Sequence, residues 1–552
     1  AHLGLPLSFR YFVDALYAGN GCHISAGGET HSGFSIRAGI RQGCPLSPLL
    51  FAVVLDPFLR LLKKLVPEAT LAAYADDLAL VTQDLAGSVR VVAPAFATFA
   101  AVSGLALNLA KTVVIPLGEA TPAHVRARFA DTHPGWGAAA YQHWAEYLGF
   151  TLGPDGMHRG WSKTLTKYKE RAALWKQIAL GLFFTATAYN VYIGSLLGFV
   201  LQLETLPPEW RQIEQSTLRS LVPGPYRWAL PEDLHRLRSD YGMPQEFLDM
   251  AEVSIAARFR VFHREASAAG GLQVRAEKRR LDAANVASPF IVRGGRWRQW
   301  YRSSYVHNLA DAVDHCRAQG IDLAKVEATA TGHSQRPWTA AQDKRARKQV
   351  QRRTRVLLRP ACSARTKIRL RHKLARRHLP LHGGRRVERA IAVLGRLRRL
   401  VPPRVQAALL RTWFNGWCTK RRFQQAEGSS CMLGCLHGQD SVEHYSTCRH
   451  VFAYGASKLR LDDPGEPEAR RAKFFLLDRE GLRADADLQA MALLQAAIYR
   501  LHCRHRRSSL RLADEETASR AIAQAVREAA MGHARALAML NHRWVRSGGG
   551  RS

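Results

Sequence analysis

Two adjacent aspartates between short apolar runs constrain the fold of this chain more than any other feature. The run Leu71–Tyr74 precedes Asp76 and Asp77, and the run Leu78–Val81 follows them. Short apolar runs on both sides of a polar turn are typical of a β-hairpin, here with a turn that begins at Ala75. Such a hairpin holds two carboxylates next to one another on a rigid support.

Two carboxylates at such a turn form a candidate site for divalent cations. Adjacent carboxylates repel one another unless a cation lies near them. Mg²⁺ prefers oxygen ligands and keeps coordination positions for phosphate oxygens, and two such ions can stabilise both oxygens of a phosphoryl transfer. The alternative is a solvated turn without a ligand, but the wholly apolar flanks weigh against it.

A loop that leads into a helix lies about thirty residues upstream, in the sequence RQGCPLSP. Gly43 permits close backbone approach, and Ser47 with the proline after it marks the start of a helix. Gln42 and Ser47 offer uncharged hydrogen-bonding groups that suit a base or a sugar. By itself this segment is also compatible with an ordinary loop-to-helix junction.

In this order and spacing, four segments resemble the motifs of reverse transcriptases, specifically those of non-LTR (LINE-like) retrotransposons. The stretch GIRQGCPLSPLLF is similar to motif B, YADD to motif C, GLALNLAKT to motif D, and YLGF to motif E, the primer grip. The resemblance covers residues 1–150 strongly and the helices up to about residue 230 weakly. It implies a right-hand polymerase palm with part of the fingers, a thumb, and RNA-templated DNA synthesis.

The resemblance also implies roles for individual residues. Asp76 and Asp77 are expected to bind catalytic Mg²⁺. Lys111 is expected to lie near the leaving pyrophosphate, as a cation or general acid. The residues expected at the template and the incoming nucleotide are Arg41, Gln42, Gly43, Pro45, Ser47 and Tyr74.

One essential carboxylate of the family has no counterpart in the sequence. The family carries a further aspartate in motif A, upstream of motif B, and Asp14 is a poor substitute because it lies inside a helical pattern. We therefore expect that the chain begins just after motif A. We also expect these residues to be inactive by themselves, since a two-metal site needs this ligand.

A second set of metal ligands follows the pattern Cys-x3-Cys-x8-His-x3-Cys. Three thiolates and one imidazole at these spacings can hold one structural, tetrahedral Zn²⁺. His437 or His450 could replace the histidine of this set, and unrelated cysteines in a loop are the alternative. The segment resembles the CCHC zinc motif downstream of the polymerase in non-LTR elements. The expected ligands are Cys431, Cys435, His444 and Cys448.

The chain has a formal net charge of +35, which implies a polyanionic partner such as nucleic acid. Residues 1–150 are neutral, with 10 basic and 10 acidic residues, so the excess lies in residues 151–552. Residues 341–425 carry 26 basic residues against two acids, which predicts phosphate contacts and salt-sensitive binding. The alternatives are a solvated helical face or, at Lys344–Arg355, a nuclear-localisation signal. Trp413 and Trp417 are interpreted either as base-stacking or as core residues.

The remaining pattern predicts an α+β palm followed by mostly helical parts. Ile178–Leu203 has 26 residues without a charge, which favours a buried helix or helix pair over a membrane span because of its polar content. The nine cysteines, an odd number, do not suggest a disulfide framework. The expected parts are the palm and fingers (1–150), thumb-like helices (151–230), a helical connector (231–340), a basic helical region (341–425), the zinc motif (426–460) and a helical tail (461–552).

The sequence thus favours a fragment of a non-LTR reverse transcriptase. The expected partners are an RNA template, a DNA primer or target, and deoxynucleotide triphosphates, with no membrane and with a nuclear location. One alternative is a catalytically dead nucleic-acid-binding remnant of a retroelement. A group II intron-type maturase shares YADD but is less favoured, because such proteins do not usually carry this zinc motif.

Overall fold

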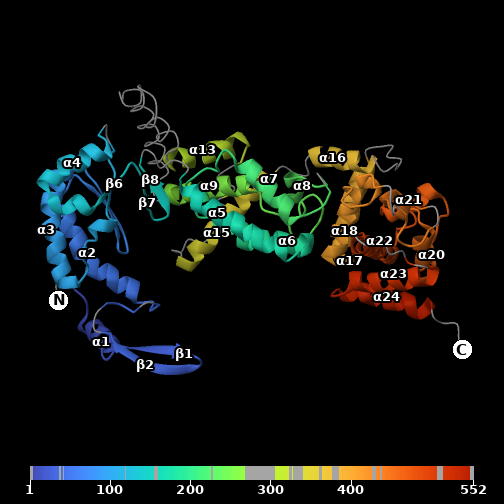
Figure 1. Cartoon of the computed structure of the whole chain (residues 1–552), viewed down its shortest axis with the longest axis horizontal. Coiled ribbons are helices and arrows are strands. Elements are labelled where there is room, and N and C mark those ends of the chain that lie inside the picture. The colour runs from blue at the N-terminus through green and yellow to red at the C-terminus, as the bar shows by residue number, and fades with distance from the viewer. Residues whose placement is uncertain are drawn as a thin grey trace. The chain divides into compact units, whose positions relative to one another are not determined.

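The computed structural model divides the chain into two compact units, residues 1–156 and 157–552 (Figure 1). The described residues are 4–36, 39–41, 43–117, 120–153, 159–225, 228–267, 305–321, 326, 340–359, 364–375, 385–425, 430–435, 438–506, 512 and 514–547. The predicted domain boundary at residue 150 lies close to the division between the units.

The first unit mixes helices with short strands. Its helices are α1 (Leu7–Tyr17), α2 (Ser47–Leu65), α3 (Leu85–Ser103) and α4 (Pro122–Thr132), with 3-10 turns η1 (Leu109–Lys111) and η2 (Pro134–Ala138). Its strands are β1 (Gly21–Ala26), β2 (Glu29–Ser35), β3 (Thr70–Tyr74), β4 (Asp77–Val81), β5 (Val113–Val114), β6 (Ala140–Tyr141), β7 (Ala145–Tyr147) and β8 (Phe150–Leu152). They form four two-stranded sheets, of which β5–β6 is parallel and the other three are antiparallel hairpins.

Local sequence signals explain most boundaries in this unit. Pro48 lies in the first turn of α2, where its missing N–H is not needed. Asp84 caps α3 by accepting a hydrogen bond from the Gly87 N–H, and Gly104 ends the helix in a left-handed conformation. Strand β5, just after Lys111, pairs with β6 over two residues only, and its Val113 stays 37% exposed.

The core of the first unit lies between α2, α3 and the β3–β4 hairpin. Phe58 and Leu62 of α2 pack with Val92 of α3, and Leu78 and Leu80 of β4 lie against this cluster. The hairpin is therefore fixed by the helices on either side of it in sequence.

The second unit is helical over its described residues. Its helices are α5 (Gly160–Gln177), α6 (Gly181–Ala188), α7 (Trp210–Leu221), α8 (Pro231–Leu234), α9 (Met250–Ser267), α13 (Tyr305–Ala318), α15 (Ala340–Leu358), α16 (Ala364–Ala375), α17 (Arg385–Leu400), α18 (Pro403–Trp413), α19 (Val442–Tyr445), α20 (Arg449–Leu459), α21 (Pro467–Phe474), α22 (Asp485–His505), α23 (Glu515–Ala530) and α24 (Ala534–Ser547). The predicted helical character of residues 341–425 is confirmed by α15 to α18. In the predicted helical tail, α23 and α24 are separated by a turn at Gly532, which has φ +74°.

The uncharged segment Ile178–Leu203 is buried on one side only, so the prediction of a buried segment is confirmed in part. Leu182, Tyr189 and Leu197 belong to the core of the second unit, whereas Ile178, Phe184 and Phe199 are at least 50% exposed. It does not form a regular helix pair. It runs as α6, a π-helical turn at Tyr189–Ile193, and 3-10 turns at Gly194–Leu197 and Val200–Gln202. The one described helix that is long and apolar enough to cross a membrane is α3, and such a single helix is weak support for a membrane span.

A continuous core joins α5 to α24 in the second unit, and a smaller cluster lies around α9, α13 and α15. Trp413 and Trp417 belong to the larger core and are fully buried. The indole N–H of Trp413 donates to the carbonyl oxygen of Phe475 at 3.0 Å. The interpretation of these two tryptophans as base-stacking residues is therefore wrong, because no nucleobase can reach their rings.

Candidate active site and metal centre

The two aspartates lie at the tip of a tight hairpin. Tyr74 pairs with Asp77 across β3 and β4, so Ala75 and Asp76 alone form the turn. Asp76, Asp77 and Tyr74 are all exposed, with Tyr74 at 67%. The predicted hairpin is confirmed, with a turn one residue shorter than expected. It offers two adjacent carboxylates to solvent, which is the arrangement that oxygen-binding divalent cations need.

The predicted nucleotide-binding loop is anchored to α1 and to the start of α2. The Arg41 guanidinium donates to the Leu16 carbonyl oxygen at 2.7 Å and to the Asn20 side chain. The buried Ser47 hydroxyl donates to the Arg41 carbonyl oxygen at 2.6 Å and lies 3.3 Å from the Tyr17 hydroxyl. Both side chains thus fix the loop in this structure, and their predicted contact with a nucleotide stays a prediction.

The other predicted residues of this site are distributed over separate loops. Gly43 has φ +84°, which a residue with a Cβ rarely adopts, and Pro45 after it is exposed. Gln42 lies outside the described residues. Lys111 is exposed at the end of η1, and its backbone N–H donates to the Asn108 side chain, which caps this turn. The conformation of this loop explains why an asparagine stands three residues before the lysine.

The segment similar to motif E is a second hairpin turn. Tyr147 of β7 pairs with Phe150 of β8, and Leu148 and Gly149 between them have φ +51° and +79°. The two central residues of YLGF thus form the turn of a short antiparallel hairpin.

The cysteine-rich segment brings its four predicted ligands together. The ligand atoms of Cys431, Cys435, His444 and Cys448 all lie within 4.8 Å of one another. The three thiols are buried, and the Cys435 and Cys448 sulfurs are 3.5 Å apart. His450 is not a member of this group, and His437 lies outside the described residues.

The donor set fits a closed tetrahedral Zn²⁺ site. The Cys431 thiol donates hydrogen bonds to Cys435 and Cys448, and these bonds together with burial raise the pKa of Cys431 far above its usual range. Burial lowers the pKa of His444, but the neighbouring thiols raise it more, to about 9. The three thiols and the histidine lie so close together that they can all lose their protons only when a bound cation balances the charge.

A helix cap, a backbone hydrogen bond and a glycine hold the four ligands in position around one point. Ser441 caps α19 by accepting a hydrogen bond from the His444 N–H at 3.1 Å. The Cys431 N–H donates to the carbonyl oxygen of Gly438 at 2.6 Å, which closes the loop between the first two cysteines and α19. A Cβ at Gly438 would collide with the His444 ring, so glycine is needed there.

Sequence reasoning missed a polar network that joins this centre to α22. The Tyr445 hydroxyl donates to Asp440 Oδ1 at 2.8 Å, and His502 Nε2 lies 3.5 Å from the same oxygen. Trp417 stacks on the Tyr445 ring. The sequence signal that could have pointed to it is the histidine-rich stretch around Cys503. Among the described residues this stretch forms no metal site, and His502 instead faces Asp440.

The basic segment exposes arginines along its helices. Arg371 of α16 and Arg389, Arg398 and Arg399 of α17 are exposed. Glu388, one of only two acids in this segment, lies 3.2 Å from Lys367. The segment therefore presents a surplus of positive charge to solvent, as predicted from its composition.

The family match of this chain lies in the first unit. Residues 5–152 match the family described as "Reverse transcriptase (RNA-dependent DNA polymerase)". The chain is 32% identical over 118 residues to the "Retrovirus-related Pol polyprotein from type-2 retrotransposable element R2DM" of Drosophila melanogaster. This match covers 20% of this chain and 11% of the relative.

A second relative is the "Transposon TX1 uncharacterized 149 kDa protein" of Xenopus laevis. It is 35% identical over 86 residues, which cover 14% of this chain and 7% of the relative. The matches thus span about a tenth or less of the length of these relatives. The predicted resemblance to non-LTR reverse transcriptases is confirmed.

Proposed function

We propose, from the premise that residues 5–152 are a reverse transcriptase domain of the non-LTR retrotransposon type, that this chain is part of an RNA-directed DNA polymerase. The observation that carries the proposal is the hairpin tip, where Asp76 and Asp77 stand exposed on a support fixed by α2 and α3. When bound there, Mg²⁺ would polarise the α-phosphate of a deoxynucleotide and stabilise the charge that develops during transfer.

The chain's own residues would prepare that reaction. Asp76 and Asp77 would hold the cation, and Lys111 would stabilise the leaving pyrophosphate. The loop of Gly43 and Pro45 would face the template and the incoming nucleotide. Arg41 and Ser47 support this loop through the hydrogen bonds that they make to α1 and to one another.

The test is primer extension on an RNA template. The chain is produced together with any residues that precede Ala1 in its reading frame. We expect Mg²⁺-dependent incorporation that falls at least about a hundredfold in Asp76→Asn and in Asp77→Asn. Asp56→Asn is the matched control, because Asp56 is an exposed carboxylate of α2 that pairs with Arg60. Unchanged extension by the two hairpin variants would refute the assignment of the metal ligands.

The second unit supports a nucleic-acid-binding role that does not depend on catalysis. Its exposed arginines on α16 and α17 and its share of the charge favour contacts with an RNA or DNA backbone. This role also describes the alternative function, a retroelement remnant that binds nucleic acid without copying it. Salt-sensitive RNA binding with no incorporation at any Mg²⁺ concentration would favour that alternative.

The cysteine cluster is proposed to hold a structural Zn²⁺. Metal analysis of the purified chain tests this proposal, and we expect about one zinc ion per chain.

The basic charge and the family resemblance are the reasons to propose a nuclear location. Imaging of the tagged chain in cells tests this proposal, and exclusion of the chain from the nucleus would refute it.

A further inference from the structure

The loop that carries Gly43 and Pro45 is tied to the C-terminal end of α1. The Arg41 guanidinium, at the start of this loop, donates to the Leu16 carbonyl oxygen at 2.7 Å and to the Asn20 side-chain oxygen. The last turn of α1 contains no basic residue of its own. Arg41 therefore supplies, from 25 residues further along the chain, the cation that the negative end of a helix dipole favours.

Tyr17 joins the two ends of the same loop through its hydroxyl group. The Tyr17 hydroxyl oxygen lies 3.5 Å from the backbone nitrogen of Arg41 and 3.3 Å from the hydroxyl oxygen of Ser47. The buried Ser47 hydroxyl donates its proton to the Arg41 carbonyl oxygen at 2.6 Å. The Tyr17 hydroxyl therefore donates to Ser47 and accepts from the Arg41 N–H. The Tyr17 ring also lies under the Arg41 guanidinium, with 5.7 Å between its centre and the guanidinium carbon.

Asn20 connects a third element to these contacts. Its carbonyl oxygen accepts a hydrogen bond from the Ile36 N–H at 2.8 Å, directly after β2 ends. Its side-chain oxygen accepts from Arg41. Tyr17, Asn20 and Arg41 thus form a joint between α1, the base of the β1–β2 hairpin and the loop. A change of the Asn20 side chain alone acts on the loop and leaves the backbone bond to the hairpin in place.

We propose that Tyr17 and Asn20 are positioning residues of the polymerase site, which act on the incoming nucleotide through Arg41 and the loop of residues 41–47. This role rests on the proposed function, because it needs the loop to meet the nucleotide. A loop released from α1 adopts conformations that do not bind, and the apparent affinity falls with the fraction of chains in which the loop is in place. The joint is the same before and during the transfer step, so its loss weakens binding without slowing that step.

Steady-state primer extension, with the chain produced as for the test of the proposed function, separates this role from a general structural one. Asn20→Ala and Tyr17→Phe should each raise the KM for deoxynucleotide about fivefold, with kcat changed less than about twofold. Tyr11→Phe is the matched control, because Tyr11 lies on the same helix and is 69% exposed. Asn20→Asp keeps the acceptor and should restore the KM. No rise of KM in Asn20→Ala and Tyr17→Phe relative to Tyr11→Phe would overturn the proposal.

A double variant shows whether Arg41 acts through α1 or contacts the nucleotide itself. Arg41→Gln removes the cation, and Asn20→Ala removes its acceptor. If Arg41 acts through this bond, the KM of the double variant should equal that of Arg41→Gln within about twofold. Increases of KM that multiply in the double variant would show independent contributions and would overturn the proposal.

Hydrogen exchange of the full chain provides a readout that does not depend on polymerase activity. The loop amides, among them the Cys44 N–H that bonds to the Arg41 carbonyl oxygen, should exchange several-fold faster in Asn20→Ala and in Tyr17→Phe. The amides of β3 and β4 should exchange at an unchanged rate. Unchanged exchange of the loop in both variants would overturn the proposal.

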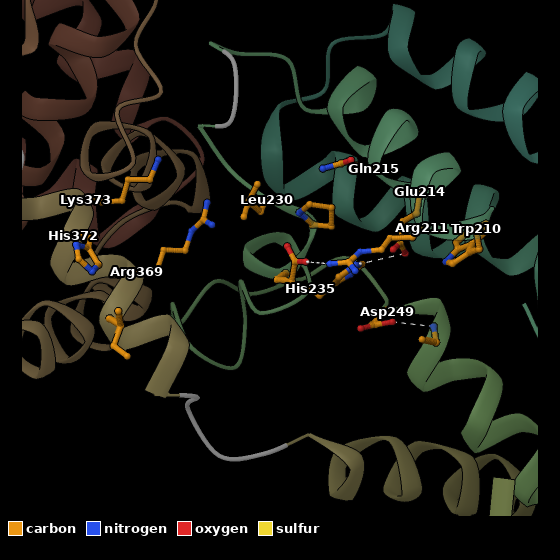
Figure 2. A pocket seen from close by; sticks show the side chains of 14 residues that line it. Trp210, Arg211, Glu214, Gln215, Leu230, His235, Asp249, Arg369, His372 and Lys373 are labelled. Atoms are coloured by element: carbon orange, nitrogen blue, oxygen red, sulfur yellow. Dashed lines mark hydrogen bonds and ion pairs between the residues drawn. The ribbon is translucent and has the colours of Figure 1, made fainter. Parts of the chain in front are cut away.

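Helix α7 of the second unit is the internal reference for exchange. It is held there by the buried pair of Glu214 and His235, whose side chains lie 3.5 Å apart (Figure 2). An unmodified chain that extends no primer would refute the proposed function, and exchange alone would then decide whether the joint holds the loop. Normal extension by the unmodified chain, with KM and exchange unchanged in the variants, would overturn only the role of the joint.

Discussion

A single alanine in a left-handed conformation shapes the turn that presents the two aspartates. Ala75 has φ +50°, which costs a residue with a Cβ about 1 kcal/mol relative to glycine. The two-residue turn between β3 and β4 needs this conformation, because Tyr74 pairs directly with Asp77. The hairpin therefore carries local strain at the residue beside the predicted metal ligands.

Replacement of this alanine by glycine should relieve the strain. We expect Ala75→Gly to stabilise the hairpin against local opening by about 0.5–1 kcal/mol. Native-state hydrogen exchange of the amides in Thr70–Val81 measures this change. Ala73→Gly is the control, because Ala73 lies in the extended strand β3, where glycine should destabilise. A loss of protection in both variants would contradict this account of the turn.

The buried pair of Glu214 and His235 should make stability depend on pH. The pKa of His235 is about 9 in the folded chain, above the value of about 6.5 for an exposed histidine. The protonated imidazole therefore stabilises the fold fully below about pH 6.5, and this contribution is lost as the pH rises towards 9. The loss is on the order of 3 kcal/mol.

Thermal unfolding between pH 6 and 10 tests this dependence. Other groups titrate in the same range, so the readout is the difference between the unmodified chain and His235→Gln. The stability of the unmodified chain should fall more steeply with pH than that of the variant. Parallel curves would mean that His235 is neutral in the folded chain.

The residues that could be predicted from the sequence are those whose partners are close in the chain. Asp76 with Asp77 and the four-ligand CCHC pattern are local, so spacing alone indicates their chemistry. The pairs Glu214–His235 and Asp440–His502 join helices or turns that are distant in sequence. No pattern of residue types in the sequence predicts these two pairs, because only tertiary packing brings the partners of each pair together.

At the scale of elements, the sequence predicted helices where their ends carry caps or prolines. Helix α2 begins at Ser47 and ends at Leu65, as expected. The uncharged pattern of Ile178–Leu203 predicts a helix or helix pair but not the π-helical and 3-10 turns that interrupt it. Asn190 bonds across to the backbone of residues 246 and 248. Contacts of this kind can override helix propensity, and a one-dimensional pattern does not contain them.

The zinc motif is an element of the larger core and does not protrude from it. Cys431, Cys448 and Tyr445 are fully buried, and Trp417 packs on Tyr445. The Leu512 N–H donates to the Met432 carbonyl oxygen inside the motif. Folding of the motif is therefore coupled to that of the helices around it.

Removal of the metal should therefore destabilise the surrounding helical core as well as the zinc motif. We expect a strong zinc chelator to lower the unfolding temperature by several degrees or more, and to shift tryptophan emission to the red as Trp413 and Trp417 become solvated. Cys435→Ser should reproduce both effects without chelator. Cys418→Ser is the control, since Cys418 lies outside the cluster. Loss of zinc with unchanged unfolding and emission would show that the motif is independent of the core.

At the scale of the whole molecule, charge separates the two units. The unit that contains the reverse transcriptase domain is nearly neutral, and residues 151–552 carry the entire excess of +35. A neutral unit gains little affinity from phosphate attraction. The basic unit gains affinity in proportion to the number of counterions that it releases from the nucleic acid. The affinity of the whole chain for RNA should therefore be set by the second unit.

Salt dependence distinguishes the two units in the intact chain. Substitution of the exposed α17 residues Arg389, Arg398 and Arg399 by glutamine should reduce the slope of log affinity for RNA against log salt. The reduction should be about 0.7–0.9 for each arginine that contacts a phosphate. The control substitutes Arg10, Arg60 and Arg90 of the first unit, which are also exposed, so the net charge changes equally. If both triple variants reduce the slope alike, net charge alone governs binding. A reduction confined to α17 would instead locate the phosphate contacts on the basic helices.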